Sequence, residues 1–308
     1  MSSTGNFENC NQLLHDFEEL DAFFQCEGYL FFRDVLDRKK ILEAKTDFVQ
    51  ILQQQGIVEH EGTEPVWAGK GMEHIDDEAL YSLDSHRKIW ESSRMQSLME
   101  KIFNESVFMF KGINIRFSLP SDEKYLTVPH QDHYYISQTP NFRTVWIPVM
   151  DIEQGMGGLE LIRASHKLGL LEHIEDNGVE SYILKGRNQS GIALDTISGN
   201  WLTTEYRPGD LLVLHSHTIH RSMPNLSKKI RLSMDNRFQP ISEPRISQAE
   251  KTILELRRYR KVVVQRAQDE GASSELTERV LLEMMKSGLS ADRENVKKII
   301  MKHSVERY

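Results

Sequence analysis

The sequence predicts a mainly β fold with flanking helices, an α+β arrangement, and three observations lead to this prediction. Residues 106–240 hold several short β-prone runs separated by turn residues. Residues 1–105 carry apolar side chains at helical spacing, and residues 241–308 are rich in charge with the same spacing. Many short strands separated by turns indicate a sandwich or barrel, and the helical spacing at both ends adds helices around it.

Residues 1–105 are expected to form helices around one short buried strand. Gly28 and Gly56 follow the first two helical stretches, in the position where glycine commonly ends a helix. The stretch after Gly56 has several glycines and no clear period, which is typical of a loop. The expected elements are a helix over 13–24, a strand over 29–32, a helix over 35–55, a loop over 56–77 and a helix over 92–103.

Residues 106–240 are expected to form the β core. Turn signals such as Gly155-Met156-Gly157-Gly158 and Pro208-Gly209-Asp210 separate the strands. The expected strands cover 106–110, 113–117, 144–149, 159–162, 211–214 and 230–234.

The tail, residues 241–308, is expected to be helical over 247–268, 276–285 and 296–301. Three roles stay open for this tail: a separate helical lobe, a lid, or a surface for homo-oligomer formation.

Composition narrows the classes of protein. The chain has 308 residues, 39% of them hydrophobic, which is enough for a substantial core. Its formal net charge of −8 argues against a nucleic-acid partner, which needs a basic face. Two cysteines indicate a reducing compartment, the first residues lack the pattern of a signal peptide, and no apolar run approaches the ~20 residues that span a bilayer. We therefore expect a cytoplasmic protein without a membrane partner.

The most informative stretch is His130-Gln131-Asp132. If it is an extended strand, His130 and Asp132 leave the same face and Gln131 leaves the other. One imidazole and one carboxylate are two thirds of the 2-His-1-carboxylate triad that holds non-haem Fe(II). Taken alone, the pair is more often a surface hydrogen-bonding pair than a metal site.

A third ligand is expected from a strand further along the chain. His215, His217 and His220 are the candidates, and all three together could instead form a zinc-like cluster. We favour His220 because a turn follows it and the chain then returns as a strand over 230–234, which carries Arg231. Neighbouring strands lie ~4.8 Å apart, so this hairpin brings Arg231 near the metal.

Arg231 suggests what the metal site is for. A guanidinium binds a carboxylate through two parallel hydrogen bonds, and the far carboxylate of an iron-chelating 2-oxoglutarate needs such an anchor. Ser222 and Ser233 can each add a hydroxyl donor. Taken alone, Arg231 is more often a surface residue paired with an acid; together with the three candidate ligands it favours a site.

These residues resemble the phytanoyl-CoA dioxygenase-like (PhyH) family of Fe(II)/2-oxoglutarate-dependent oxygenases over most of the chain to about residue 240. The order and spacing of the motifs carry the resemblance. They are 28–36, 128–132, 145–148, 157–167, 208–213, 220–225 and Arg231. Two departures are Arg163-Ala164 in place of the family's Pro-Gly, and Phe117-Ser118-Leu119-Pro120 where members often have Lys-Pro-Pro.

The resemblance implies a double-stranded β-helix, a jelly-roll or cupin-like fold. The oxygenase domain is expected to cover residues 1–240, with a helical part over 1–105 and the β-helix core over 106–240. A helical C-terminal extension is expected to follow over 241–308. The resemblance also implies Fe(II), 2-oxoglutarate and O2 as cofactor and co-substrates, and succinate and CO2 as co-products. The metal ligands it implies are His130, Asp132 and His220, and the residues at 2-oxoglutarate are Arg231, Ser222, Trp146 and Thr127. No catalytic residue beyond the metal ligands is expected.

The implied reaction is hydroxylation, desaturation or cyclisation of a small-molecule metabolite. Related halogenases lack the metal-binding carboxylate, and Asp132 is present, so halogenation is not expected. His133, Tyr134 and Tyr135 follow the metal pair directly. They are either alternating core and surface residues of a strand or members of the substrate pocket, and the sequence does not separate the two.

Two alternatives stay open. One is a double-stranded β-helix that binds a ligand or partner without catalysis, against which the intact set of His130, Asp132, His220 and Arg231 argues. The other is a cupin-type metalloenzyme that uses His215, His217 and His220 without 2-oxoglutarate. An Arg231→Ala variant separates the readings, since only the favoured one predicts a raised KM for 2-oxoglutarate with metal binding retained.

Overall fold

The structure of the chain is a computed structural model. It describes residues 5–60, 62–122, 125–136, 139, 141–173, 180–181, 187–188, 191–243, 263–264, 266–287, 289 and 293–305. The chain divides into two compact units, residues 1–244 and 245–308. Among the described helices, none is long and apolar enough to cross a membrane.

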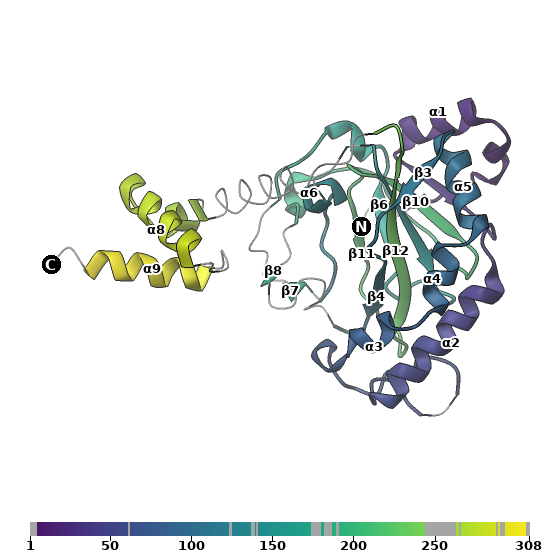
Figure 1. The fold of residues 1–308 in the computed structure, drawn as a ribbon, viewed down its shortest axis with the longest axis horizontal. Coiled ribbons are helices and arrows are strands. Elements are labelled where there is room, and N and C mark those ends of the chain that lie inside the picture. The colour runs from purple at the N-terminus through teal and green to yellow at the C-terminus, as the bar shows by residue number, and fades with distance from the viewer. Residues whose placement is uncertain are drawn as a thin grey trace. The chain divides into compact units, whose positions relative to one another are not determined.

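The first unit is built on two β-sheets (Figure 1). The larger has the order β2-β10-β5-β12-β3, with β4 also pairing with β12, and the smaller has the order β1-β9-β6-β11. The large sheet consists of β2 (Tyr29–Phe32), β3 (Val107–Met109), β4 (Asn114–Ser118), β5 (Arg143–Pro148), β10 (Leu211–His215) and β12 (Arg231–Pro240). The small sheet consists of β1 (Gly5–Asn6), β6 (Leu159–Ile162), β9 (Trp201–Thr203) and β11 (His220–Ser222). A separate pair joins β7 (Glu180–Ser181) to β8 (Arg187–Asn188).

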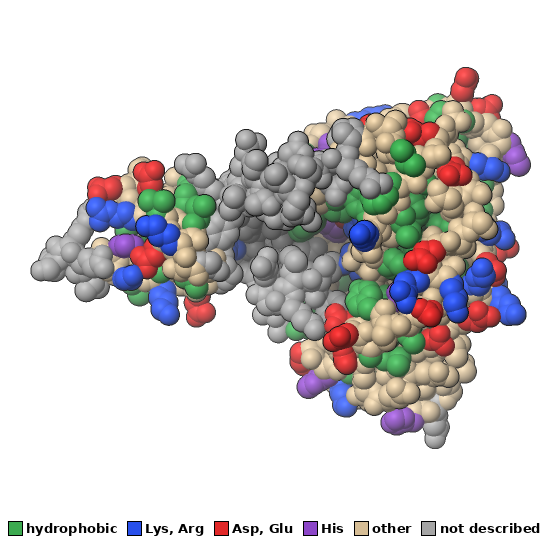
Figure 2. All heavy atoms as spheres, in the orientation of Figure 1, with side chains coloured by type: hydrophobic (Ala, Val, Ile, Leu, Met, Phe, Trp, Pro, Cys, Tyr) green, Lys and Arg blue, Asp and Glu red, His purple; other side chains and the backbone are tan. Residues whose placement is uncertain are grey.

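Helices cover one side of this β core, as Figure 1 shows. They are α1 (Phe17–Glu27), α2 (Arg38–Gln54), α3 (Asp77–Tyr81), α4 (Ser85–Trp90) and α5 (Ser93–Phe103). One apolar cluster joins helices and both sheets, with Phe24, Phe48, Ile102, Leu161 and Met234 among its buried members. On the face in Figure 2, acidic and basic side chains are interspersed over the helical side of this unit.

The predicted fold class is confirmed, because both sheets and the flanking helices are present. The ends of the helices follow from their caps. Asp16 and Asp37 accept backbone N–H groups at the starts of α1 and α2, so these helices begin later than the apolar pattern suggests. Ser92 does the same for α5, as its position in the sequence predicts.

Several elements differ from the expectation. Helices α3 and α4 were not predicted, because each is only about one turn long and lacks a readable period. A 3-10 helix (Met72–His74) lies within the expected loop over 56–77. The strand expected over 230–234 continues to Pro240, and all ten residues of β12 are buried.

The interpretation of His130-Gln131-Asp132 as a strand was wrong. His130 makes an isolated bridge with His220, but Asp132 is the first residue of the short helix α6 (Asp132–Ile136). The physical reason lies in Gln131, whose amide donates to the carbonyls of Gly169 and His217 and accepts the N–H of Leu171. These contacts turn the chain out of the sheet directly after His130.

The second unit has its own small core around Val280, Met284, Val296 and Ile299. It contains α8 (Ser274–Ser287) and α9 (Arg293–Val305), in the places where the sequence predicts helices over 276–285 and 296–301. Most of the helix expected over 247–268 lies outside the described residues.

Candidate metal and co-substrate site

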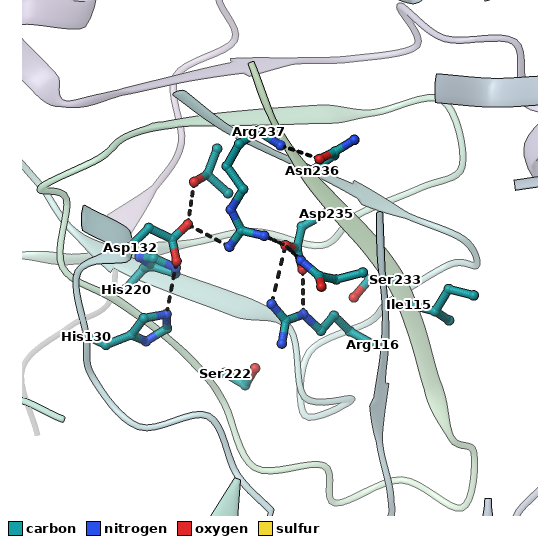
Figure 3. A network of polar contacts seen from close by, with 12 residues as sticks. Ile115, Arg116, His130, Asp132, His220, Ser222, Ser233, Asp235, Asn236 and Arg237 are labelled. Atoms are coloured by element: carbon teal, nitrogen blue, oxygen red, sulfur yellow. Dashed lines mark hydrogen bonds and ion pairs between the residues drawn. The ribbon is translucent and has the colours of Figure 1, made fainter. Parts of the chain in front are cut away.

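His130, Asp132 and His220 meet at one buried point between the sheets. Their potential ligand atoms all lie within 4.8 Å of one another. Nε2 of His130 lies 3.5 Å from Oδ1 of Asp132, and Nε2 of His220 lies 4.0 Å from the same oxygen. The backbones of the two histidines exchange hydrogen bonds of 3.0 and 3.1 Å, which fixes their rings side by side, as Figure 3 shows.

The donor set fits a divalent metal ion. Nδ1 of His130 lies 2.8 Å from the Val128 carbonyl, and Nδ1 of His220 lies 3.0 Å from the Thr218 carbonyl. A carbonyl can only accept, so Nδ1 carries a proton in both rings, and each Nε2 faces Asp132. Such outer hydrogen bonds are the usual way in which proteins orient histidine ligands.

The charge states suit metal binding. Burial, and then the neighbouring His130, lowers the pKa of His220 to about 4, so this ring is neutral near pH 7. Burial alone would raise the pKa of Asp132, but the Arg237 guanidinium and the two histidines hold that pKa well below its usual range. The site therefore presents two imidazoles, of which that of His220 is neutral, and one carboxylate, a set of ligands that binds Fe(II) and leaves positions open.

A cavity opens beside this triad and reaches Arg231, Ser222, Trp146 and Thr127. It is lined by residues of the large sheet and by Leu159 and Ser222 from the small sheet, so it lies between the two. The structure thus brings together all the residues that the sequence predicts for the metal and for 2-oxoglutarate.

Arg231 is a buried cation whose partners are all neutral. Its guanidinium donates to Ser233 Oγ at 2.6 Å, to Ser222 Oγ at 3.1 Å and to the Gly157 carbonyl at 2.9 Å. Among the described residues, no carboxylate forms an ion pair with it. Burial lowers its pKa only to about 10, so it stays charged near pH 7. A buried cation of this kind is suited to an incoming carboxylate.

The three residues after Asp132 lie elsewhere. His133, Tyr134 and Tyr135 are on α6, and none of them is among the residues that line the cavity. The ring of Tyr135 meets that of His130 edge-on at 5.6 Å, and Tyr134 stacks on His173 at 4.0 Å. Of the two readings of these residues, alternation along a strand was wrong because the chain is helical there, and a role in binding the substrate stays a prediction.

His215 and His217 do not reach the cavity lining either. The ring of His215 packs against those of Phe24 and His166, and that of His217 packs against His133. Within the described part of the chain, the set formed by His130, Asp132 and His220 is the candidate metal cluster. The three-histidine cluster considered for the sequence is not formed.

Sequence reasoning missed several polar residues of the cavity, among them Arg116, Thr144, Asp235 and Arg237. The signal for two of them was present. Arg231, Ser233, Asp235 and Arg237 alternate along one strand, so all four side chains leave the same face of β12. Extending the expected strand beyond Met234 would have found them.

Comparisons with known proteins agree with this site. Residues 24–233 match the phytanoyl-CoA dioxygenase (PhyH) family. The 1-deoxypentalenic acid 11-beta-hydroxylase of Streptomyces exfoliatus is 32% identical over 250 residues, which cover 78% of this chain and 87% of the hydroxylase. The phytanoyl-CoA dioxygenase of Arabidopsis thaliana is 30% identical over 166 residues, or 50% of this chain and 52% of that protein.

Solved structures share the fold. The non-haem monooxygenase ThoJ superposes with a TM-score of 0.55 at 16% identity, covering 74% of this chain and 80% of that one. The epimerase SnoN, solved with Fe3+, alpha-ketoglutarate and nogalamycin RO, gives a TM-score of 0.53 at 20% identity, covering 76% and 87%. With the family match and the triad, these findings lead to one conclusion: the chain belongs to the phytanoyl-CoA dioxygenase (PhyH) family and is an iron- and 2-oxoglutarate-dependent oxygenase.

Proposed function

We propose that this oxygenase oxidises a small-molecule metabolite at a site in which His130, Asp132 and His220 bind Fe(II). The observation that carries the proposal is the buried cluster of three ligand atoms within 4.8 Å of one another, opening into the cavity that also holds Arg231. When bound, iron and 2-oxoglutarate allow O2 to oxidise a C–H bond, and 2-oxoglutarate leaves as succinate and CO2.

The protein's own part is to orient these groups. Arg231 and Ser222 bind the far carboxylate of 2-oxoglutarate, and Trp146 and Thr127 form the walls beside it. The Ser222 N–H also donates to the Thr127 carbonyl at 3.1 Å, which holds the backbone of Ser222 beside Thr127 at this end of the cavity. Because Asp132 occupies the position that halogenases leave for a halide, we expect oxidation without halogenation.

Hydroxylation is the form of oxidation that we favour over desaturation or cyclisation. Its support is the Streptomyces exfoliatus relative, which covers most of this chain and is named as a hydroxylase of 1-deoxypentalenic acid. Tyr135 is the member of the 133–135 group placed best to meet a substrate, because its ring contacts that of the metal ligand His130.

The first test is spectroscopic. Anaerobic addition of Fe(II) and 2-oxoglutarate to the purified protein should give the metal-to-ligand charge-transfer band of the chelate, and His220→Ala should abolish it. A well-folded protein without the band, or an H220A protein with the wild-type band, contradicts the site.

The second test is turnover. Incubation with Fe(II), 2-oxoglutarate, O2 and a library of candidate metabolites should release succinate and a product that has gained oxygen or lost hydrogen, detected by mass spectrometry. A well-folded protein that releases no succinate, either from 2-oxoglutarate alone or with any member of the library, would favour the alternative of a binding module without catalysis.

The remaining proposals concern the whole chain. We propose that residues 1–240 form the oxygenase domain, with 1–105 as its helical part and 106–240 as its β-helix core, and that 241–308 is an extension available for homo-oligomer formation. Leu282 and Met285 of α8 are 52% and 44% exposed, which supports a contact surface there. We further propose a cytoplasmic location, supported by two cysteines, Cys10 and Cys26, that are both free.

A further inference from the structure

We propose that Arg237 is a positioning residue that presents Asp132 to the metal through a single carboxylate oxygen. The inference rests on the proposed metal site and adds a residue to it that none of the family motifs contains. Its basis is the polar network in Figure 3, in which the two oxygens of Asp132 have different partners.

The carboxylate of Asp132 is divided between the metal site and the sheet. Oδ1 is the oxygen that faces the two histidines, 3.5 Å from Nε2 of His130 and 4.0 Å from Nε2 of His220. Oδ2 accepts a hydrogen bond of 3.0 Å from Nη2 of Arg237 and a second one from the Thr144 hydroxyl. With Oδ2 occupied by two donors, Oδ1 alone is turned toward a metal ion.

The two donors are placed by the register of the large sheet. Thr144 of β5 is the direct cross-strand partner of Arg237 of β12, so both side chains leave one face at the same level. Asp132 lies at the start of α6 and not in this sheet, so its orientation depends on these contacts.

Arg237 is itself held in place. Its Nη1 donates to Asp235 Oδ1, two residues back on the same strand face. Asp235 in turn accepts from Arg116 Nε at 2.5 Å and from Asn114 Nδ2 at 2.8 Å. Charges therefore alternate in sign along the row Asp132, Arg237, Asp235 and Arg116. Each buried charge lies beside a charge of opposite sign, which buried ions require.

The chemical consequence concerns the open positions on the metal. A carboxylate that can rotate freely can bind a metal through both oxygens and occupy a second position. Because Arg237 and Thr144 hold Oδ2 away, a bound metal ion would keep that position open for the co-substrates. The planar fork of arginine can bridge Asp132 and Asp235 at once, whereas the single ammonium of lysine cannot fix both angles.

The test compares metal binding in four proteins: the wild type, Arg237→Gln, Arg237→Lys and Thr144→Val. Metal-free protein is titrated with Mn(II), and free Mn(II) is measured by EPR. Loss of an outer partner of a ligand commonly weakens metal binding 10–100-fold, so we expect about this for R237Q, with R237K and T144V between it and the wild type. The anaerobic Fe(II)–2-oxoglutarate band should also shift or weaken in R237Q.

Two controls separate the possible failures. Arg143→Lys alters a buried arginine beside Thr144 whose guanidinium lies 4.2 Å from the rings of Phe24 and Phe103. Its polar partners are the Ile102 carbonyl and Asp21 instead of Asp132, so R143K should keep the wild-type Mn(II) affinity. H220A should lose Mn(II) binding, and if it does not, the metal site itself is wrong. If H220A behaves as expected while folded R237Q binds Mn(II) like the wild type, the role of Arg237 is refuted. Where R237Q does not fold, R237K takes its place in this comparison. Full recovery in R237K would likewise refute the bridging role, because charge alone would then suffice.

Discussion

At the scale of single residues, Arg231 and Arg237 show how two arginines on one strand face acquire different roles. Arg237 pairs with Asp132 and Asp235, whereas Arg231 contacts two hydroxyls and a carbonyl. Six residues of strand separate them by about 20 Å of chain. Arg231, which has no carboxylate partner within the described chain, is suited to bind the carboxylate of the co-substrate. Arg237, which pairs with two carboxylates, is suited to hold a metal ligand in place.

Arg231 gives the first prediction. Replacing it by Gln should weaken 2-oxoglutarate binding about 10–100-fold, because hydrogen bonds to charged groups contribute about 1.5–3 kcal/mol. Arg231→Lys should fall between R231Q and the wild type, since it keeps the charge without the fork. The measurement is anaerobic titration of the Fe(II)-loaded protein with 2-oxoglutarate, followed by the charge-transfer band. Mn(II) affinity is the control and should not change; a parallel loss of Mn(II) affinity would mean that Arg231 supports the metal site instead.

How much of the site the sequence could predict depends on distance along the chain. His130 and Asp132 are near neighbours in a motif, and His220 and Arg231 lie on either side of a readable turn. Arg237 was missed because its partner Asp132 lies 105 residues away and because the expected strand ended too early. A sequence shows which side chains of a strand leave the same face of the sheet, but it does not show which distant segment packs against that face.

At the scale of elements, Gly28 connects the first helix to the part of the fold that carries the proposed metal site. It caps α1 in the left-handed conformation, with φ of 78°. Its carbonyl accepts the hydroxyl of Thr218 at 2.6 Å and the N–H of His215 at 3.0 Å. Thr218 lies two residues before His220, so this glycine braces the turn that carries a proposed ligand.

The second prediction is that Gly28→Ala destabilises the protein far more than Gly69→Ala. Both glycines have positive φ, so alanine costs about 1–2 kcal/mol of backbone strain at either position. A Cβ at residue 28 would also lie 2.4 Å from His166 Nδ1 and 2.8 Å from Thr218 Oγ1, whereas nothing lies within 4 Å at residue 69. Overpacking adds about 1–3 kcal/mol at Gly28 alone. Urea unfolding measures both, and equal losses would contradict the argument.

Elements were predicted best where one local rule decides them. Strand β6 covers the residues that the sequence predicts, because a short apolar run that follows glycines is too short for a helix and is typical of a strand. Helix α6 was mistaken for a strand because three contacts of Gln131 with distant segments override the local pattern. Such contacts join residues 38 to 86 positions apart and leave no periodic trace in the sequence.

At the scale of the whole molecule, the two units have separate apolar cores. All residues of the cavity belong to the first unit, residues 1–244. The third prediction is therefore that a chain ending at residue 244 still folds and binds Mn(II) and 2-oxoglutarate within about threefold of the full chain, a difference of less than 1 kcal/mol. Calorimetry and the charge-transfer titration test this. A larger loss would assign part of the site, or of its support, to the extension.

Stability of the whole molecule should also fall in mild acid because of a buried histidine row. The rings of His166, His215 and His217 follow one another at 4.9 and 5.5 Å. Burial, and then the neighbouring histidines, lowers the pKa of His215 to about 3, and burial lowers the pKa of His166 and His217 too. All three are neutral in the folded protein near pH 7 and take up protons more readily when it unfolds.

The fourth prediction follows from the sign of this shift. Between the pKa of His215 in the unfolded chain, about 6.5, and its pKa in the folded protein, about 3, the unfolded chain binds a proton that the folded protein does not bind. The contribution of His215 to stability is therefore fully present above pH 6.5 and falls as the pH drops toward 3. Within this window His215 removes about 1.4 kcal/mol per pH unit. His215→Asn keeps an acceptor for the His217 N–H, now donated to His215 Nδ1 at 3.0 Å, and removes one titrating group. Urea unfolding of the metal-free proteins between pH 7.5 and 5 should show a shallower fall in the free energy of unfolding for H215N, by about that amount per pH unit. Equal slopes in the two proteins would show that His215 is not held neutral by the fold.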